Sequence, residues 1–521
     1  MTASAEKQAI KAEALYNQLS NDRNPYIDRA RRAAELTVPY LMPPDGSSGT
    51  TDFVEPSQSL GSRGVRHLAS TTMLTLFPPN VPFYKYEVDD IAMDEITEEY
   101  RGEVEKALNR RERAVMSEIN ASAFRPVSFE AFRQLIVSGN YLVHVPQEGK
   151  IKGYRLTNYV VQRDASGNVL AIVIKETIAK SALPEDVISN LPPEAQEKQD
   201  KDEIDLYTAI VWDAEQQQFT SFQEVLGVPI TGTEGTWPRE LLPWVPLRFT
   251  SIEGEDYGRG LVEELIGDLN SLDALSTALR EGTAQAAKVV WMIDPASGVR
   301  PRDLSTAENG AFVKGNAAYV TPLQMNKQAD FAVAERHMQS LTERISFAFM
   351  LHTAIQRNGE RVTAEEIRFM ASELDKSLGG VYTLLADEFQ IPIVRLFEKR
   401  MEKKRKVPPL PEEVTSTSIV AGMDALGRGN DLQNLELLVA GLQAVLGPEG
   451  TMTYLNGGEY IKRRGAALGI DMDGLIRSEE EIQKAERQQQ LQALAQHLGP
   501  QAINQMGGMA KEQMKTESET Q

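Results

Sequence analysis

The sequence Gln356-Arg357-Asn358-Gly359-Glu360-Arg361, followed by Thr363-Ala364-Glu365-Glu366, divides the stretch that decides the fold, residues 330–405. Thr363 and Glu366 fit a capping box, in which each side chain satisfies an amide at the start of a helix. Apolar residues recur at helical spacing on both sides of the division. They are Ala334, Met338, Leu341, Ile345 and Ala348 before it, and Ile367, Met370, Leu374, Leu378, Val381, Leu385, Phe389, Ile393 and Leu396 after it. The stretch therefore predicts a helix, a short connection and a second helix.

The second helix is unusually long if it continues to Lys403. At 1.5 Å per residue it would extend roughly 60 Å, whereas helices of globular domains average about three turns. Gly379-Gly380 and Pro392 predict a bend, because glycine weakens a helix and proline removes an amide donor. We interpret this helix as an element that connects distant parts of the protein.

Composition narrows the class of protein. A chain of 521 residues with 41% hydrophobic content predicts several folded domains. It has no run of about eighteen apolar residues, so we expect no membrane span, and the N-terminal residues predict no signal peptide. With no cysteine, disulfides and thiolate zinc sites are excluded. The net charge of −20 disfavours tight binding of nucleic acid over the general surface.

The first part of the chain predicts helices and then strands. We expect helices at 5–36, with a break at Asn24-Pro25, and at 57–76, 94–119 and 129–137. Strands are predicted at 141–145, 154–162, 169–176, 204–212 and 218–225, with helix and loop over 183–202. This pattern favours an α+β class, predominantly helical, with an antiparallel sheet.

The second part predicts a pair of helices around a small insertion. One helix covers 258–287 with leucines on one face, and the other covers 330–351. Short strands are expected between them at 289–293, 311–313 and 318–320. After the proline-rich residues 408–411, helices are expected at 431–446, 460–468 and 479–498, with a polar, disordered end.

A search for catalytic patterns gives no enzyme. The sequence has no phosphate-binding loop and no nucleophile elbow. Its five histidines are too scattered to predict a metal pair, and we interpret Asp202-Glu203-Asp205 as a solvated loop rather than a magnesium site. A nuclease pattern beginning at Asp164 fails, because Val173 stands where an acid should precede Lys175. We predict no cofactor and no metal.

Two basic segments have alternative interpretations. The cluster Arg395, Lys399, Arg400 and 403–406 contains cations that are favoured near a helix C-terminus, and we favour that interpretation over a contact with DNA or an acidic partner. The residues 356–361 are either a plain connection between helices or a loop that touches a phosphate backbone without reading bases. Composition leaves both interpretations of the loop open.

Several segments give the chain a family resemblance. It resembles the head-to-tail connector, or portal, proteins of short-tailed bacteriophages from about residue 15 to about residue 435. The most specific match is 356–368, which contains the capping box. The other matching segments are Asn21–Tyr26, Leu68–Pro78, Tyr159–Asp164, Tyr257–Arg259, Lys327–Phe331 and Ser346–Leu351.

The resemblance implies a portal fold. Its parts would be an α/β wing (1–257), stem helix 1 (258–287), a small clip with strands (288–329), stem helix 2 (330–352), a tunnel loop (353–362), a long wing helix (363–406), a helical crown (407–498) and a disordered tail (499–521). The tunnel-loop residues facing DNA would be Gln356, Arg357, Asn358, Gly359 and Arg361. The clip residues that dock partner proteins would be Arg300, Arg302 and Lys314.

The resemblance also implies the function. We expect a ring, normally a dodecamer, at one capsid vertex of the virion, assembled in the host bacterial cytoplasm. It would form a channel for packaging and ejection of double-stranded DNA and a docking platform for the terminase large subunit and tail adaptor proteins. The major capsid, scaffolding and internal core proteins are further expected partners. Twelve copies would carry a charge of about −240, which disfavours tight gripping of DNA.

Two alternatives remain at this stage. The first is a structural adaptor or scaffold-like virion protein without a DNA channel. The second, more distant, is an enzyme such as a nuclease. Ring formation with an open pore separates the portal from the adaptor, and metal-dependent cleavage would indicate the enzyme.

Overall fold

The computed structural model describes most of the chain up to residue 464. The described residues are 11–78, 82–88, 98–197, 199, 201–286, 290–295, 298–316, 318, 320–323, 328–351, 380–408, 415–419, 427–455, 457, 458, 460, 461 and 464. The chain divides into two compact units, Met1–Ala425 and Leu426–Gln521. Helices and antiparallel sheets occur together in the first unit, which confirms the predicted α+β class.

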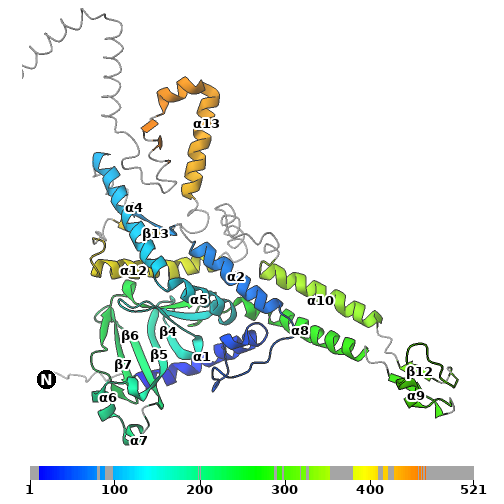
Figure 1. Ribbon diagram of the computed structural model, residues 1–521. Helices are drawn as coiled ribbons and strands as arrows, with labels where there is room; N and C mark the ends of the chain where they lie inside the picture. The colour runs from blue at the N-terminus through cyan, green and yellow to red at the C-terminus, as the bar shows by residue number, and fades with distance from the viewer. Residues whose placement is uncertain are drawn as a thin grey trace, which may run out of the picture. The chain divides into compact units, whose positions relative to one another are not determined.

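Helices are the commonest regular elements of the first unit (Figure 1). The long ones are α1 (Ala12–Glu35), α2 (Leu60–Leu76), α4 (Glu98–Ala121), α5 (Phe124–Ser138), α8 (Leu261–Ala286), α10 (Gln328–Ala348) and α12 (Ile391–Lys403). The short ones are α6 (Glu185–Asn190), α7 (Pro193–Gln196) and α9 (Pro301–Ser305), with 3₁₀ turns η1 (Pro39–Leu41), η2 (Leu156–Asn158), η3 (Lys180–Ala182) and η4 (Arg239–Leu241). A π-helical turn, η8 (Ala386–Gln390), immediately precedes α12.

The strands among the described residues form four antiparallel sheets. The largest has the order β4 (Tyr159–Arg163), β5 (Val169–Ala179), β6 (Glu203–Asp213), β7 (Gln218–Val225) and β8 (Val228–Pro229), with β9 (Gly235–Trp237) also on β7. A second has the order β10 (Trp244–Arg248), β2 (Asn140–His144) and β3 (Lys152–Tyr154). The pairs are β11 (Val290–Ile293) with β12 (Val320–Leu323), and β1 (Tyr84–Val88) with β13 (Thr415–Ile419).

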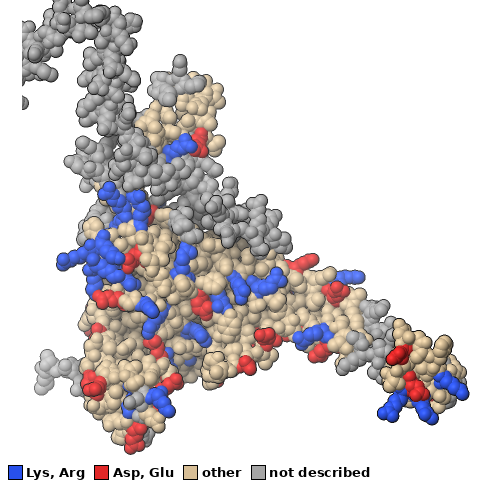
Figure 2. Space-filling model, in the orientation of Figure 1, with Lys and Arg blue, Asp and Glu red and all other residues tan. Residues whose placement is uncertain are grey.

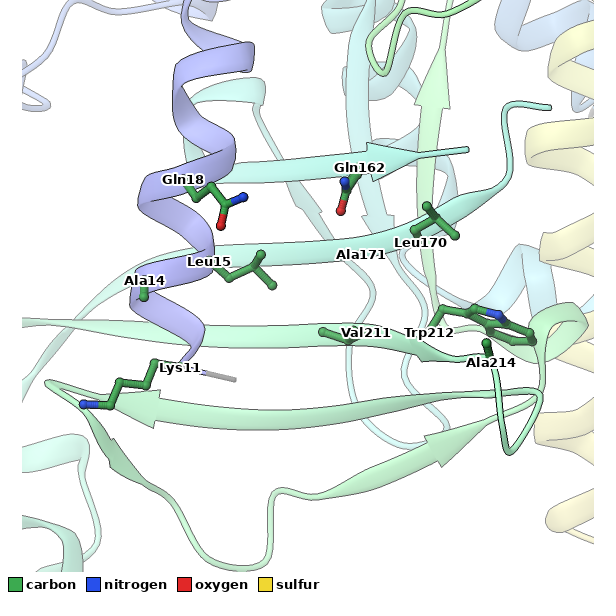
Figure 3. A pocket seen from close by; sticks show the side chains of 10 residues that line it. All are labelled: Lys11, Ala14, Leu15, Gln18, Gln162, Leu170, Ala171, Val211, Trp212 and Ala214. Carbon is green, nitrogen blue, oxygen red and sulfur yellow. The ribbon is translucent and has the colours of Figure 1, made fainter. Parts of the chain in front are cut away.

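Helix α1 covers one face of the largest sheet (Figure 3). Tyr16 and Leu19 on α1 are buried in one cluster with Val160, Val173 and Tyr207 from the strands. The sheet thereby positions α1, and the main core extends from α1 through α2 and α5 to α12. Burial of apolar area on this scale supplies the main stabilisation of the unit.

The predicted break at Asn24-Pro25 is wrong. Helix α1 is continuous through Pro25. Proline cannot donate to the carbonyl of Asn21 one turn earlier, but Asn21 and Pro25 are both exposed, so water can hydrate that carbonyl. The buried face of the helix, which includes Ile27 and Ala30, is unaffected and keeps the segment helical.

Helix α5 begins earlier than predicted and ends at a glycine. It starts at Phe124 rather than at 129, since Pro126 lies in the first turn, where a missing amide donor costs little. Gly139 ends it with φ of 76°, and its amide donates to the carbonyl of Leu135 at 2.9 Å. A Cβ at Gly139 would lie 2.5 Å from the carbonyl carbon of Arg259, so this close approach requires glycine.

The predicted strand 154–162 is two strands separated by η2. The buried guanidinium of Arg23 donates to the carbonyls of Thr157 and Tyr159, both at 3.1 Å, and these bonds hold the chain out of the ladder. The other predicted strands of this region are present with small shifts of their ends, and helices α6 and α7 occupy the segment predicted as helix and loop.

The insertion between α8 and α10 also differs from the prediction. Residues 311–313 form no strand. Ala311 and Phe312 are exposed and Val313 is only half-buried, so the apolar residues there do not indicate a buried strand. A helical turn, α9, precedes them and was not predicted. Strands β11 and β12 lie close to the predicted strands 289–293 and 318–320.

The long helix is described only from residue 380. The predicted start at Thr363, Gly379 and the whole connection 353–362 lie outside the described residues. The bend expected from Pro392 takes the form of the π-helical turn η8, which ends just before it. Pro392 has no amide hydrogen to donate to the preceding turn, and sharp bends in helices occur at prolines and at π-helical turns.

The second unit contains one described element, α13 (Gly427–Tyr454), longer than the predicted helix 431–446. Gly447 interrupts it with φ of 72° and ψ of 173°, so two helical segments meet there. Of the two later predicted helices, only residues 460, 461 and 464 are described, and 479–498 lies outside.

Candidate functional site

Helices α8 and α10 lie side by side and lead to the β11–β12 hairpin (Figure 1). Leu269 and Leu272 on α8 and Leu341 and Ile345 on α10 are buried in the main core. Arg344 on the second helix forms a bidentate ion pair with Asp268 on the first. Farther along, a Cβ at Gly282 would lie 2.8 Å from the ring of Phe331, so the two helices approach closely there as well.

The base of this helix pair is fixed to the N-terminal region by polar contacts. The Ser57 amide donates to Asp273 at 2.6 Å, and the Thr277 hydroxyl donates to the Ser57 hydroxyl at 2.7 Å. Arg259, just before α8, pairs with Glu255 at 2.7 Å and with Glu263 at 3.0 Å. The Arg259 guanidinium holds the pKa of the Glu255 carboxyl below its usual range. These contacts orient the pair at its base.

At the end of α10, Phe349 packs on α2. A Cβ at Gly64 would lie 2.4 Å from the Phe349 ring, so only glycine allows this contact. Phe349 itself is fully buried. The direction in which the chain leaves α10 is thus fixed by an aromatic side chain seated against α2.

The other end of the pair, residues 290–323, exposes most of its side chains. The predicted docking residues Arg300, Arg302 and Lys314 are all exposed, and the structure places them in one small segment without testing their role. Large apolar side chains are exposed beside them. They are Trp291 and Met292, each 57% exposed, and Phe312, which is fully exposed.

The predicted DNA-facing residues Gln356, Arg357, Asn358, Gly359 and Arg361 lie outside the described residues. The structure therefore does not test this part of the prediction. The flanking elements are described: Leu351 ends the segment before the loop, and the helix that follows is described from Gly380.

Glu388 in the π-helical turn joins the long helix to two sheets. It accepts hydrogen bonds from the backbone amide and guanidinium of Arg248, at 3.1 Å and 2.9 Å, and lies 3.8 Å from the guanidinium of Arg163. Burial lowers the pKa of Arg163. Its backbone amide donates to the Asp256 carboxylate at 2.7 Å, and its guanidinium donates to the Asp256 carbonyl at 3.2 Å. Gln390, fully buried, donates to the carbonyl of Leu76 at 2.6 Å.

The sequence analysis did not identify Glu388. One signal was available: Arg248 ends the apolar strand Trp244–Arg248, and an arginine in a buried strand requires an acceptor. Sequence periodicity could not say which carboxylate supplies it, because the partner is 140 residues away.

The basic cluster at the end of α12 contacts α4 and a neighbouring loop. Lys404 and Lys406 pair with the same carboxylate, Glu118, at 3.1 Å and 2.7 Å, and both lower its pKa. Lys403 donates to the side chain of Gln147 at 2.7 Å. These contacts agree with the favoured interpretation of cations placed at a helix C-terminus.

The described residues give no catalytic constellation. Among them, no group of three histidines, acids or cysteines could hold a metal, and Asp205 pairs with Lys175 at 2.8 Å. A cavity of about 590 Å³ lies between α1 and the largest sheet. Most of the side chains that line it are apolar, for example Leu15, Leu170 and Trp212 (Figure 3). None of the described helices combines the length and apolarity that a bilayer crossing requires.

A family model decides the identity. The model for the bacteriophage head to tail connecting protein matches residues 9–476. The chain belongs to this family. The resemblance inferred from the sequence is thereby confirmed, and the match spans both the sheet region and the α8–α10 pair.

Curated relatives cover nearly the whole chain. The portal protein of Escherichia phage T7 is 40% identical over 516 residues, which is 96% of each chain. The portal protein of Enterobacteria phage T3 is 40% identical over 91% of this chain and 89% of the relative, and that of Enterobacteria phage SP6 is 30% identical over 93% of each. Among solved structures, the neck of an empty gene transfer agent particle gives a TM-score of 0.35 at 12% identity, covering 80% of this chain and 91% of the other.

Proposed function

We propose that this connecting protein is a portal protein: a ring at one capsid vertex of the virion that conducts double-stranded DNA during packaging and ejection. The observation that supports this most strongly is the 40% identity to the phage T7 portal protein over 96% of both chains. An adaptor without a channel, the alternative from the sequence, has no comparable support, because the four curated relatives share the name portal protein.

The proposed division of labour follows the elements. The sheet region with α12 is the wing, α8 and α10 are the stem, residues 288–329 are the clip and the second unit contributes the crown. Supporting the assignment, η8 and α12 pack on the sheets of the N-terminal region, and α8 and α10 lead to the exposed hairpin. Twelve copies is the expected number.

The clip is the proposed platform for the terminase large subunit and the tail adaptor proteins. Its exposed Arg300, Arg302 and Lys314 would attract acidic surfaces, and its exposed Trp291 and Phe312 would supply apolar contact. The wing and crown would face the capsid, scaffolding and internal core proteins. Host-cytoplasmic assembly belongs to the same proposal, and no catalytic activity is assigned.

Substitutions in the proposed tunnel loop test directly whether the protein conducts DNA. Alanine at Arg357 or Arg361 should leave assembly intact and reduce DNA packaging or retention by about tenfold, because phosphate contacts without base readout are lost. The assay is in vitro packaging with nuclease protection. The matched control is Arg32→Ala, which changes an exposed residue of α1. Arg361 has a competing role near the Thr363 cap. If Arg361→Ala breaks the ring while Arg357→Ala leaves DNA handling unchanged, the loop is structural and the DNA contact is wrong.

A further inference from the structure

The C-terminal end of α12 carries a concentrated positive charge in an acidic protein. Residues 391–408 contain seven lysines and arginines and two carboxylates, Glu398 and Glu402, whereas the whole chain has a net charge of −20. Figure 2 shows lysine and arginine side chains gathered over α12 and the neighbouring α4. We call the following residues the α12 basic surface: Arg395, Lys399, Arg400, Lys403, Lys404, Arg405 and Lys406.

Contacts among the described residues leave this charge largely uncompensated. Lys404 and Lys406 share the single carboxylate of Glu118. Lys399 lies 3.4 Å from Glu402, which also accepts a hydrogen bond from Arg111 at 2.7 Å. Each of these carboxylates therefore serves two cations, and the surface keeps a positive potential.

Two further cations contact neutral acceptors. Lys403 donates to the Gln147 side chain and Arg400 donates to the carbonyl of Gly149 at 3.3 Å. The second carboxylate of α12, Glu398, is largely buried: burial raises its pKa, and Tyr86, Arg111 and Arg395 interact with it. It contributes little negative charge to the outer surface.

An apolar cavity of about 290 Å³ lies beside the basic surface. Lys399 belongs to the basic surface and also lines the cavity. Gln147, another lining residue, accepts a hydrogen bond from Lys403 of the basic surface. Its apolar wall consists of Val145, Trp237, Pro238, Leu241, Pro243 and Leu396. The space equals roughly ten water molecules, which suits one aromatic or branched aliphatic side chain.

We propose that the α12 basic surface and this cavity together are a docking site for an acidic segment of a partner protein, anchored by one apolar side chain. Buried apolar or aromatic anchors supply most of the affinity at protein interfaces, and surrounding charges steer the partner and fix its register. A DNA duplex would supply the negative charge but no free apolar group to fill the cavity. The combination favours a peptide, and the site is independent of DNA conduction through the channel.

The test measures binding of short fluorescent peptides to the full-length assembled protein. The probes are Glu-Glu-X-Glu-Glu peptides with leucine, phenylalanine or tryptophan at X, a matched peptide with serine at X, and a twelve-base-pair DNA duplex. Fluorescence anisotropy gives the dissociation constants at two salt concentrations. At least one apolar peptide should bind at least about tenfold more tightly than the serine peptide, because only it fills the cavity.

Variants separate the two halves of the site. Lys399→Glu with Lys403→Glu should weaken the best apolar peptide by at least about tenfold and remove its salt dependence. Thr236→Trp, at the exposed rim of the cavity, should weaken the apolar peptide and leave the serine peptide unchanged. Lys201→Glu, in the exposed turn before β6, is the matched control and should change binding less than about twofold.

Three outcomes overturn the proposal. Equal binding of the serine peptide or of DNA would make this a general polyanion surface. No binding of any apolar peptide at millimolar concentration would mean that the site is closed, as it would be if a second copy of the chain covered it. Binding that Thr236→Trp leaves unchanged would place the anchor elsewhere.

Discussion

The sheet region of residues 11–257 and the α8–α10 pair use their apolar residues in different ways. Helices α1, α2 and α5 have buried residues along most of their lengths. Helix α8 buries only Leu261, Val262, Leu269 and Leu272, all in its first half, and between Leu272 and Leu341 no described side chain is buried. The first region is stabilised by its own core, whereas the second leaves apolar surface that the other described residues do not cover and that we expect a second copy to cover.

The largest effect is expected where the long helix meets the sheets. Glu388→Ala leaves Arg163 and Arg248 buried without their shared carboxylate, which should lower the free energy of unfolding by about 3–5 kcal/mol. Denaturant unfolding of dissociated chains measures the change. Lys152→Ala is the control: it removes the exposed Lys152–Glu176 pair and should cost less than about 1 kcal/mol. Equal losses would mean that buried contacts do not hold the long helix against the sheets.

The next effect compares two leucines on α8. Leu269→Ala creates a cavity in the core and should cost about 2–4 kcal/mol. Leu279→Ala, on the half-buried second half, should cost less than about 1 kcal/mol in dissociated chains, because little area is lost. Both variants are measured by denaturant unfolding and by their assembly at equal concentration. If Leu279→Ala destabilises the dissociated chain as much as Leu269→Ala, the two halves of α8 do not differ.

The smallest effect concerns a histidine inside the sheet region. Burial lowers the pKa of His144 to about 4 from its usual 6.5, and Lys152 adds to the shift. Between these values the unfolded chain binds a proton that the folded chain does not, so stability is lost as pH falls from 6.5 towards 4. His144→Phe keeps the ring stack on Trp244 and should reduce this loss by on the order of 2 kcal/mol. Thermal unfolding of both proteins across this pH range checks it; parallel curves would contradict the buried neutral ring.

Elements with strong local patterns could be predicted from the sequence, and those fixed by distant contacts could not. The leucine spacing predicts α8 to within a few residues, and the strand 218–225 is found as predicted. The pairing of β1 with β13 could not be predicted, because two short segments far apart in the chain carry no pattern that matches them. The break predicted at Pro25 is absent, since an exposed proline in a well-packed helix costs less free energy of folding than its sequence suggests.

The candidate site was predictable in part for the same reason. The basic residues of α12 are visible in the sequence, whereas the cavity beside them combines side chains from β9, η4, α12 and the residues that follow β2, and exists only in the fold. Likewise, Arg248 signals that a buried partner exists, but only the structure identifies Glu388.

The most direct test of the account is the assembly state of the purified protein, measured by mass photometry and electron microscopy. If the protein is a portal, it should form a closed ring of many times the 57.8 kDa chain mass, with an open channel and the second half of α8 buried between copies. A stable monomer at micromolar concentration would contradict it.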